Sequence, residues 1–299
     1  MDLYLMSPPH LRWSLRGRAN PRSKRADAVD PVRARHEWLA LAEGIEALGG
    51  TVAVLPPDES LTGLPFAAEA GLPLPPLGPG QKPRFLLPRM HVEHRRAERE
   101  AWRPFVEQLG FSAIEIDEGT WEGQGDVATC EGVTLLFWGG RTDLVGVRAA
   151  KRHLSGEILE IRVREPAFHG NMAALPLPIS DSLIVCADVV DDDSVAVLEA
   201  RFGRDRIHFV SEEEIQAYST NGLPIGDTIL CPSLLPDRVR RLIERQGMKV
   251  AELKMIELCE KAGGASRCLV CVAPGVGDAI TIPDDARLSS WAEELRRGA

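Results

Sequence analysis

Residues 30–55 read DPVRARHEWLALAEGIEALGGTVAVL, and this stretch defines the unit from which the rest of the chain is built. Asp30 and Pro31 are typical of a helix start, because aspartate caps free backbone N–H groups and proline fits the first turn. Apolar residues then recur at helical spacing until Gly49, and a run rich in β-branched residues follows at 51–55. The stretch predicts a helix that ends in glycine and passes directly into a short buried strand.

The same order of helix, glycine and strand returns four more times. The glycines that end these later helices are Gly110, Gly156, Gly203 and Gly247, and the strands that follow them cover residues 111–116, 158–163, 206–210 and 248–253. Pro104 lies in the second copy and predicts a kinked or restarted helix there. Pairs of apolar strands, broken by turn residues, are predicted at 127–137, 172–185 and 222–230. The chain is therefore expected to contain five ββαβ-like units.

Five such units predict a closed ring. Each unit leaves an apolar face that only a neighbouring unit can cover, so like units must stack or close. Five copies close most simply around a pseudo-fivefold axis, as an α/β propeller with its helices outside. We expect the whole chain, residues 1–299, to form one domain of this α/β class, in which the loops at one end meet at the axis.

Composition excludes several classes of protein. The net charge of -9 argues against nucleic acid as a partner, because phosphate binding needs clustered Lys and Arg. The first residues lack the basic start of a secretory signal, and no apolar run reaches the length of a membrane span. We therefore expect a cytoplasmic protein that binds no membrane and whose six cysteines are reduced. An acidic surface without an apolar stripe is compatible with a monomer or a homodimer.

Five polar residues stand at equivalent positions in the units, each just before a predicted strand pair. They are Glu69, Glu122, His169, Asn221 and Cys268, separated by 53, 47, 52 and 47 residues. A ring that only packs would place small or apolar residues at its axis, so these side chains predict a shared site there. The alternative is that five separate strands happen to begin with a polar residue.

Four segments carry a resemblance to a known superfamily. Residues 263–269 (GGASRCL) resemble the glycine-rich nucleophile loop of the guanidino-group-modifying enzymes, whose fivefold α/β propeller is called the pentein fold. Residues 168–172 (FHGNM), 122–126 (EGQGD) and 140–143 (GRTD) are similar to the histidine, acidic and arginine motifs of that superfamily. The order and spacing match along nearly the whole chain. The sequence most resembles the dimethylarginine dimethylaminohydrolases and the amidinotransferases.

The resemblance implies a thiol-dependent hydrolase, and we expect neither a cofactor nor a metal. A guanidinium carbon resists water, so attack by a thiolate, giving an S-alkylthiouronium intermediate, divides one difficult reaction into two easier ones. Cys268 would be the nucleophile, and His169 the group that protonates the departing amine and then activates water. Glu122 would pair with His169, and Arg267 would lower the pKa of the neighbouring thiol. The products would be a citrulline-like compound and an amine.

The expected substrate is a small cationic guanidino compound, which carboxylates must meet. The residues expected to bind it are Glu69, Asp126, Arg141, Asn171 and Asn221. By the resemblance, Glu69 binds the guanidinium group and Arg141 holds the α-carboxylate of the substrate. Arg95 and Arg96 are weaker candidates for that carboxylate, since a solvated basic helix face is the more ordinary explanation for them.

Three departures from the relatives leave the substrate open. Relatives that deiminate free arginine carry Asp at the position of Asn171, and the dimethylarginine hydrolases carry acids at the positions of Gly63 and Ala68. Fewer carboxylates neutralise a guanidinium less well, so a modified guanidine, or transfer of the amidino group to an amine acceptor, is an alternative. A non-catalytic propeller that binds a partner is a third alternative, against which the three catalytic candidates argue.

Two other patterns bear on the site. Cys268 and Cys271 have the spacing of redox and metal motifs, but residues three apart on a strand face opposite sides, so we expect no shared partner. The proline-rich run at 72–80 and the basic run at 15–30 are expected to be a rim and a lid near the mouth of the site. Ordinary surface loops are the alternative for both runs.

Overall fold

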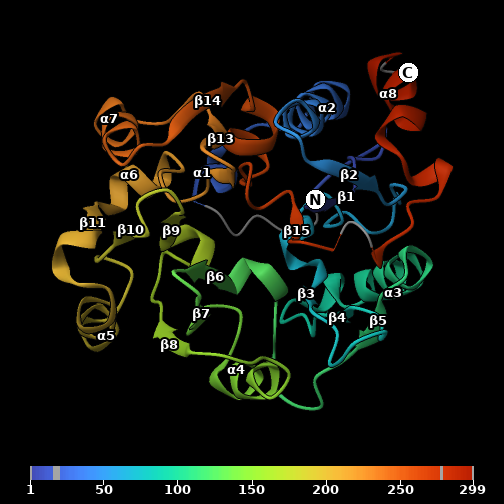
Figure 1. Cartoon of the computed structure of the whole chain (residues 1–299). Coiled ribbons are helices and arrows are strands. Elements are labelled where there is room, and N and C mark those ends of the chain that lie inside the picture. The colour runs from blue at the N-terminus through green and yellow to red at the C-terminus, as the bar shows by residue number, and fades with distance from the viewer. Residues whose placement is uncertain (1, 16–20, 277–278, 298–299) are drawn as a thin grey trace.

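The computed structural model describes residues 2–15, 21–276 and 279–297. It is a ring of five small three-stranded sheets, with one edge of each sheet near a common axis and the long helices outside (Figure 1). The pseudo-fivefold α/β propeller predicted from the repeat is confirmed. Among the described residues, every helix is too short or too polar to span a membrane.

All five sheets have the same strand order: an antiparallel pair and then a third strand parallel to the middle one. Four of them use consecutive strands: β3 (Leu72–Leu74), β4 (Arg84–Leu86) and β5 (Ser112–Ile114); β6 (Val127–Cys130), β7 (Val133–Trp138) and β8 (Ile158–Arg162); β9 (Ala174–Leu177), β10 (Ser182–Cys186) and β11 (Ile207–Val210); β12 (Leu223–Ile225), β13 (Thr228–Pro232) and β14 (Lys249–Leu253). A parallel neighbour needs a crossover, and a helix provides it in each unit.

The fifth sheet joins the two ends of the chain. Its strands are β15 (Cys271–Ala273), β1 (Leu3–Met6) and β2 (Thr51–Val54), with β1 in the middle. β1 pairs antiparallel with β15, Leu3 opposite Ala273, and parallel with β2. The ring is therefore closed by backbone hydrogen bonds between its first and last strands.

The crossover helices are α2 (Pro31–Ala47), α3 (Glu98–Leu109), α4 (Leu144–Lys151), α5 (Asp192–Phe202) and α7 (Asp237–Arg245). Asp30 caps α2 as predicted, because its carboxylate accepts the N–H groups of Val32 and Arg33. Pro104 lies inside α3, which does not restart there. The helix expected to end at Gly156 already ends at Lys151, so a short link precedes β8. Shorter helices are α1 (Pro21–Arg25), α6 (Glu212–Gln216) and the π-helix η6 (Ile256–Lys261), and α8 (Leu288–Arg297) lies at the C-terminal end.

The inner strands β3, β6, β9, β12 and β15 all start at one end of the ring. Three of them contain a proline, Pro73, Pro176 and Pro224, which an edge strand tolerates because its outward N–H has no partner strand. Along the axis these strands line a cavity of about 490 Å³. The axial cavity is thus walled by the same element of every unit.

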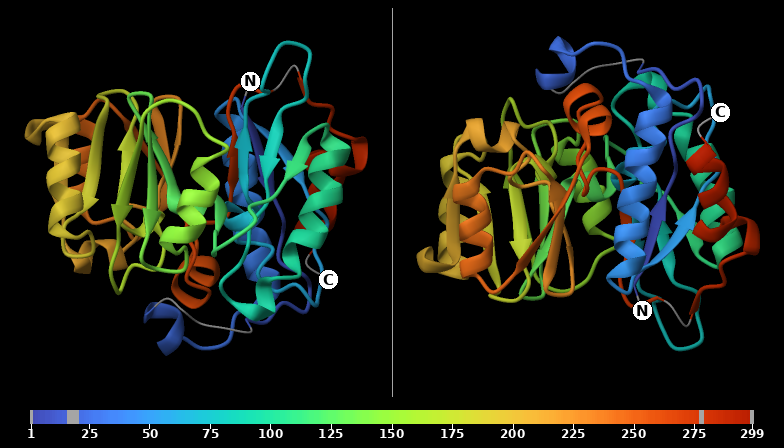
Figure 2. Two further views of the ribbon diagram at one scale, coloured as in Figure 1. Left: turned by 90° about the horizontal axis from the view of Figure 1, so that it is seen from below. Right: turned by 90° about the horizontal axis from the view of Figure 1, so that it is seen from above.

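The two ends of the ring carry different loops. Figure 2 shows α1 and η6 at the end where the inner strands start, and the loop between β3 and β4 at the opposite end. The proline-rich run expected to form a rim of the site therefore leads away from it, because β3 carries the chain along the axis. Residues 16–20 of the expected lid at 15–30 lie outside the described part of the chain. The described part of that segment contains the short helix α1.

Candidate active site

The residues at equivalent positions meet at the end of the ring where the inner strands start. Single 3-10 turns place three of them: Glu69 lies in η1 (Ala67–Ala70), Glu122 precedes η3 (Gly123–Asp126), and His169 precedes η4 (Gly170–Met172). Asn221 and Cys268 lie in turns before β12 and β15. All five side chains are buried, with Cys268 the most accessible at 8%.

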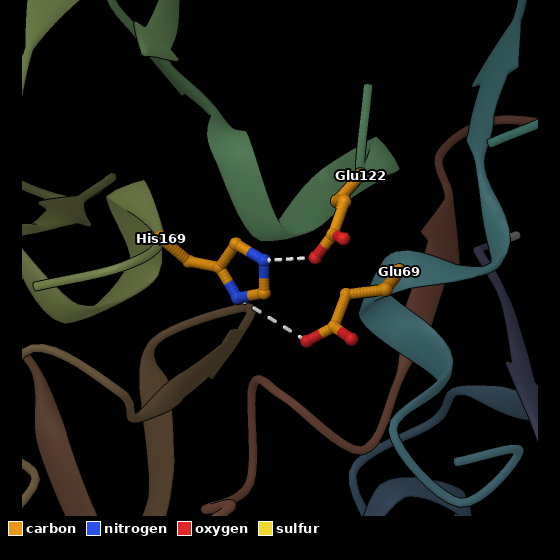
Figure 3. Close-up of side chains that lie close together, drawn as sticks. All are labelled: Glu69, Glu122 and His169. Atoms are coloured by element: carbon orange, nitrogen blue, oxygen red, sulfur yellow. Dashed lines mark hydrogen bonds and ion pairs between the residues drawn. The ribbon is translucent and has the colours of Figure 1, made fainter. Parts of the chain in front are cut away.

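His169 lies between two carboxylates (Figure 3). Its Nε2 is 2.7 Å from Oε2 of Glu122, and its Nδ1 is 3.2 Å from Oε1 of Glu69. Burial alone would raise the pKa of Glu122, but the hydrogen bond and charge of His169, with Arg141 and Arg95, lower that pKa to about 2. Each ring nitrogen of His169 therefore faces a carboxylate oxygen.

Two asparagine amides surround the thiol of Cys268. Nδ2 of Asn221 donates to Sγ at 3.1 Å, and Nδ2 of Asn171 donates to Sγ at 3.4 Å. Burial raises the pKa of the Cys268 thiol, whereas these two amides and the nearby charge of Arg267 oppose that rise. The sulfur therefore has donors that can stabilise it as a thiolate inside the ring.

The loop that carries Cys268 is fixed by neighbouring units. The carbonyl of Cys268 accepts the N–H of Ala68 at 3.0 Å, next to Glu69. Gly264 packs against the ring of Phe66 so closely that any side chain at this position would collide with it. Glu37 of α2 accepts two backbone N–H groups from the first turn of η6 at 3.1 and 3.0 Å. These contacts place the thiol relative to Glu69.

Asp126 lies next to the loop of His169, and both of its carboxylate oxygens accept hydrogen bonds from the protein. Its Oδ1 accepts the N–H of Gly170 at 2.8 Å, and its Oδ2 accepts the hydroxyl of Thr142 at 2.6 Å. Burial raises the pKa of Asp126 to about 6, against the opposing effects of His169 and the two hydrogen bonds. Both oxygens of this carboxylate are therefore engaged by the protein, and one of them holds the backbone next to His169.

Arg141 lies at the edge of the cluster. Its Nη1 is 3.5 Å from Oε2 of Glu122, and its guanidinium lies 4.6 Å from the centre of the Phe168 ring. Burial lowers the pKa of Arg141, and the charge of Glu122 opposes this effect. Its side chain keeps 17% of its surface exposed, so the group is accessible from the edge of the buried site.

Arg95 and Glu98 are buried in the site, and the sequence did not reveal this. Nε and Nη2 of Arg95 form a bidentate pair with Glu98 at 2.8 and 2.7 Å, and Arg95 is also ion-paired with Glu69. The expectation of a solvated basic face is therefore wrong for Arg95, although Arg96 is exposed. The only sign of this pair in the sequence is the spacing of three residues, which lets Arg95 and Glu98 contact each other on one helical turn. Gly63 leaves room for Arg95 and Glu98, since a side chain at position 63 would collide with both of them.

One cluster has the spacing of a metal site. The acceptor atoms of Glu69, Glu122 and His169 lie within 4.8 Å of one another, which would suit one ion. Each carboxylate already has a cationic partner from the chain, Arg95 for Glu69 and Arg141 for Glu122. Each of the two carboxylates thus already lies beside a cation of the chain, although Arg95 is shared with Glu98.

The six cysteines differ in their surroundings, although all are buried and none forms a disulfide with another described cysteine. Cys268 lies in a turn, so the expectation that Cys268 and Cys271 face opposite sides of one strand does not apply. The two thiols nevertheless have different partners, because Sγ of Cys271 is 3.7 Å from the carbonyl of Gly71 whereas Sγ of Cys268 contacts Asn171. Burial raises the pKa of Cys186 to about 11 and that of Cys231 to about 12. Only Cys268 has two side-chain amide donors among the contacts of the described residues.

A small cavity of about 10 Å³ adjoins Cys268. Its walls include Phe168, Met172, Tyr218 and Thr220. This volume is close to the room that a single water needs.

Comparisons with other proteins bear on the fold. No protein-family model matches the sequence. The chain is 25% identical over 253 residues to the uncharacterized protein ZK1307.1 of Caenorhabditis elegans, a match that covers 81% of this chain and 84% of that protein. This relative has no described activity to compare.

Solved structures resemble the fold over nearly its whole length. The N-terminal domain of ArgZ, an arginine dihydrolase of cyanobacteria, superposes with a TM-score of 0.82 at 24% identity, covering 91% of this chain and 97% of that domain. The chain spans 42% of full-length ArgZ. A dimethylarginine dimethylaminohydrolase superposes with a TM-score of 0.67 at 19% identity, covering 90% of this chain and 98% of the other. The chain therefore has the pentein fold.

Proposed function

We propose that the protein is a cysteine-dependent hydrolase that cleaves a C–N bond of an arginine-like guanidino compound. The observation that carries the proposal is the buried cluster in which Cys268 has two amide donors and His169 has two carboxylate partners. Two structures of the same fold add support. The N-terminal domain of ArgZ has been solved with a covalently bound reaction intermediate, and AgrE with its cysteine replaced by alanine has been solved with L-arginine.

The first step is attack by sulfur. Sγ of Cys268, as the thiolate, forms a bond to the guanidinium carbon, and the C–N bond to the departing nitrogen breaks as His169 donates a proton to that nitrogen. The carboxylate of Glu122, 2.7 Å from Nε2 of His169, stabilises the imidazolium that provides this proton. The amine leaves, and the remaining carbon is bound to sulfur as a thiouronium.

The second step is hydrolysis. Water adds to the same carbon, His169 takes the proton of that water, and the C–S bond breaks. The thiolate of Cys268 returns, and the product carries a ureido group. The amides of Asn171 and Asn221 then stabilise the sulfur as a leaving group, because they donate to it in the resting structure.

The remaining side chains divide between substrate and support. We assign Glu69 and Glu122 to the guanidinium group of the substrate and Arg141 to its α-carboxylate, because the two carboxylates flank His169 and Arg141 keeps part of its side chain exposed. We assign Asp126 a positioning role, because both of its oxygens hold the protein around His169. Residues 1–299 act in this proposal as one catalytic domain.

L-arginine is the substrate that we favour. The superposition on the arginine dihydrolase domain is closer than that on the dimethylarginine hydrolase, with TM-scores of 0.82 and 0.67. The number of ammonia molecules released per L-arginine distinguishes two reactions. Hydrolysis of one C–N bond releases one ammonia and leaves a ureido product, whereas a second hydrolysis releases another and leaves a free amine.

The test compares L-arginine with dimethylarginine. Ammonia, dimethylamine, and ureido and amino products are measured by mass spectrometry, with and without glycine or ornithine as an acceptor. We expect ammonia release from L-arginine, and about a 10³-fold loss in both Cys268→Ser and His169→Ala. Cys186→Ser, at a buried thiol in β10, is the matched control and should keep full activity.

Each other result points to a different protein. A new guanidino product that forms only with an acceptor would identify an amidinotransferase. Binding of L-arginine without turnover would favour a non-catalytic propeller. Full turnover by both active-site variants would refute the mechanism.

A further inference from the structure

The axial cavity is separate from the candidate active site. Its volume of about 490 Å³ lies within the range of about 300–1,000 Å³ that small-molecule sites have in proteins. Among the described residues that line it, none belongs to the five polar residues at equivalent positions. Aliphatic residues and prolines make up much of its wall, among them Leu72, Pro176, Leu223 and Val272. The cavity therefore has the size and the walls of a second small-molecule site.

The titratable side chains of this cavity are all basic. Arg84, His153 and Arg267 line it, and none of the described lining residues is Asp or Glu. The chain as a whole has 44 acidic residues against 35 Lys and Arg, so the excess of basic groups is a local feature that the composition does not explain. Such a cavity favours an anion and disfavours the cationic guanidino compound proposed for the active site.

Arg267 lies at the end of the cavity that is nearer to the active site. Its Nη1 donates to the carbonyl of Ala174 at 2.6 Å, and its Nη2 donates to the carbonyl of Val127 at 2.9 Å. These two acceptors are the first residues of the inner strands β9 and β6. Both acceptors are neutral, and no carboxylate oxygen of the described residues lies within 4 Å of a nitrogen of Arg267. The charge of this guanidinium group is therefore not balanced by an ion pair within that part of the chain.

Arg84 lies at the other end of the inner strands. It is the first residue of β4 and pairs with Leu74, the last residue of β3, beside the loop that Figure 2 shows at the end opposite the active site. Its Nε donates to the carbonyl of Pro75 at 3.1 Å, and its Nη2 donates to the carbonyl of His153 at 3.2 Å. Within the described chain, Arg84 also has no carboxylate oxygen within 4 Å.

The positions of the two cations set the shape of a ligand that would match them. Inner strands such as β3 and β6 have three and four residues, which is a length of roughly 10 Å. Arg84 and Arg267 lie near opposite ends of these strands, so one compact anion cannot contact both. An elongated molecule with a negative group at each end can, and its apolar middle would lie against the aliphatic wall.

We propose that the axial cavity binds an elongated organic dianion, an α,ω-dicarboxylate with an apolar chain between its ends. One carboxylate contacts Arg267 and the other contacts Arg84, because a guanidinium fork matches the geometry of a carboxylate. The two charges of the ligand then balance two cations that the described chain leaves without a carboxylate partner. The site goes beyond the proposed function, since it uses neither Cys268 nor His169.

The test measures the affinity of octanedioate by isothermal titration calorimetry, at constant ionic strength and without any guanidino compound. The result is therefore independent of whether the protein turns over L-arginine. Three related molecules separate the features of the ligand. Octanoate keeps the chain with one charge, butanedioate keeps both charges on a shorter chain, and octanediamide keeps the length without charge.

Variants locate the site. Arg84→Gln removes the cation at one end, Arg84→Lys keeps the charge, and Arg267→Gln removes the cation at the other end. Arg89→Gln is the matched control, because Arg89 is exposed, donates to a neutral carbonyl, that of Asp117, at 3.1 Å, and does not line the cavity. Circular dichroism checks that each variant is folded. If Arg267→Gln does not fold, the comparison of Arg84 with Arg89 still decides.

We expect the wild type to bind octanedioate about tenfold or more tightly than octanoate or butanedioate, and octanediamide most weakly. Arg84→Gln should weaken octanedioate about tenfold, so that it binds no better than octanoate, and Arg267→Gln should do the same. Arg84→Lys and Arg89→Gln should remain near the wild type. Equal affinity of the wild type for octanedioate and octanoate, no detectable binding, or equal losses in Arg84→Gln and Arg89→Gln would each overturn the proposal.

Discussion

The side chain of Asn221 contacts Cys268 at two points: its Nδ2 donates to Sγ at 3.1 Å, and its Oδ1 accepts the backbone N–H of Cys268 at 3.1 Å. The backbone carbonyl of Asn221 also accepts the N–H of Arg267 at 3.0 Å. One residue of the fourth unit therefore holds the sulfur, the backbone and the preceding residue of the proposed nucleophile. Hydrogen bonds donated to sulfur favour its charged form, so Asn221 affects both the position and the ionisation of the thiol.

Asn221→Ala should raise the pKa of the Cys268 thiol and slow its alkylation about tenfold at pH 8, because a buried thiolate loses its shorter donor. Asn171→Ala removes the longer contact of 3.4 Å and should have a smaller effect. Rates measured against pH for both variants provide the comparison. A larger effect from Asn171→Ala would reverse our ranking of the two amides.

Glu122→Gln should reduce turnover by about 10²-fold or more, because Nε2 of His169 loses its charged partner at 2.7 Å. The pKa of Glu122 is about 2 in the folded protein, below its ordinary value of 4.5, so the carboxylate adds stability above pH 4.5 that is lost as the pH falls towards 2. The free energy of unfolding in urea, measured from pH 7 down to pH 3, should therefore fall less steeply in Glu122→Gln. Parallel curves for the two proteins would contradict this assignment.

Asp126 should have the opposite pH dependence. Its pKa is raised from 3.8 to about 6, so its contribution to stability is fully present below pH 3.8 and is lost as the pH rises through 6. The loss amounts to roughly 3 kcal/mol at most, at 1.36 kcal/mol per pKa unit. In Asp126→Asn this loss is absent, so the free energy of unfolding of the wild type relative to the variant should decrease between pH 4 and pH 7. An unchanged difference would show that Asp126 does not titrate in this range.

Gly125→Ala should impair activity more than folding. A Cβ at Gly125 would lie 3.3 Å from Glu69 and 3.4 Å from the ring of His169, so it would press on both groups without a strained backbone. We expect about a tenfold or larger loss of turnover with a small change in melting temperature. Gly44→Ala in α2 is the control, because its Cβ would meet Leu230 at an ordinary 3.5 Å, and helix preference should raise stability by about 1 kcal/mol.

Arg95→Met should destabilise the protein by about 3–5 kcal/mol at pH 7, because it leaves Glu98 and Glu69 buried without their cation. The effect should decrease at pH 5, where unpaired buried carboxyls take up protons more readily. Arg96→Met changes the exposed neighbour and should be nearly neutral. Urea unfolding of both variants at the two pH values tests the pair. Equal losses in the free energy of unfolding for Arg95→Met and Arg96→Met would mean that the buried pair of Arg95 and Glu98 does not stabilise the fold.

The architecture could be predicted because its signals are local and repeated. Asp30, Pro31 and the glycine that ends each helix specify element boundaries through backbone conformation, and five copies then imply closure. Gly156 shows the limit of this reasoning. Its φ of +87° suits a turn as well as a helix end, so the sequence could not show that α4 stops at Lys151.

The site was only partly predictable for a related reason. Polar residues at equivalent positions converge because the units are related by the ring, which follows from the repeat. The burial of Arg95 and Glu98 cannot be predicted from the repeat, because the sequence pattern of two opposite charges three residues apart is the same on a surface and in a core. What distinguishes them is the space beside Gly63, which exists only once residues from different segments have packed together.

The pairing of β1 with β15 has a consequence for how the protein acquires activity. Because β1 lies in the middle of its sheet and its partner strand begins three residues after Cys268, a growing chain cannot complete the first sheet until residues 271–273 have been made. Contacts so distant along the sequence form late and slowly during folding. Cys268 lies three residues before this last strand, so we expect its contacts to form when the strand docks. Catalytic competence should therefore appear in one step at the end of folding and should disappear in one step when the first and last strands separate.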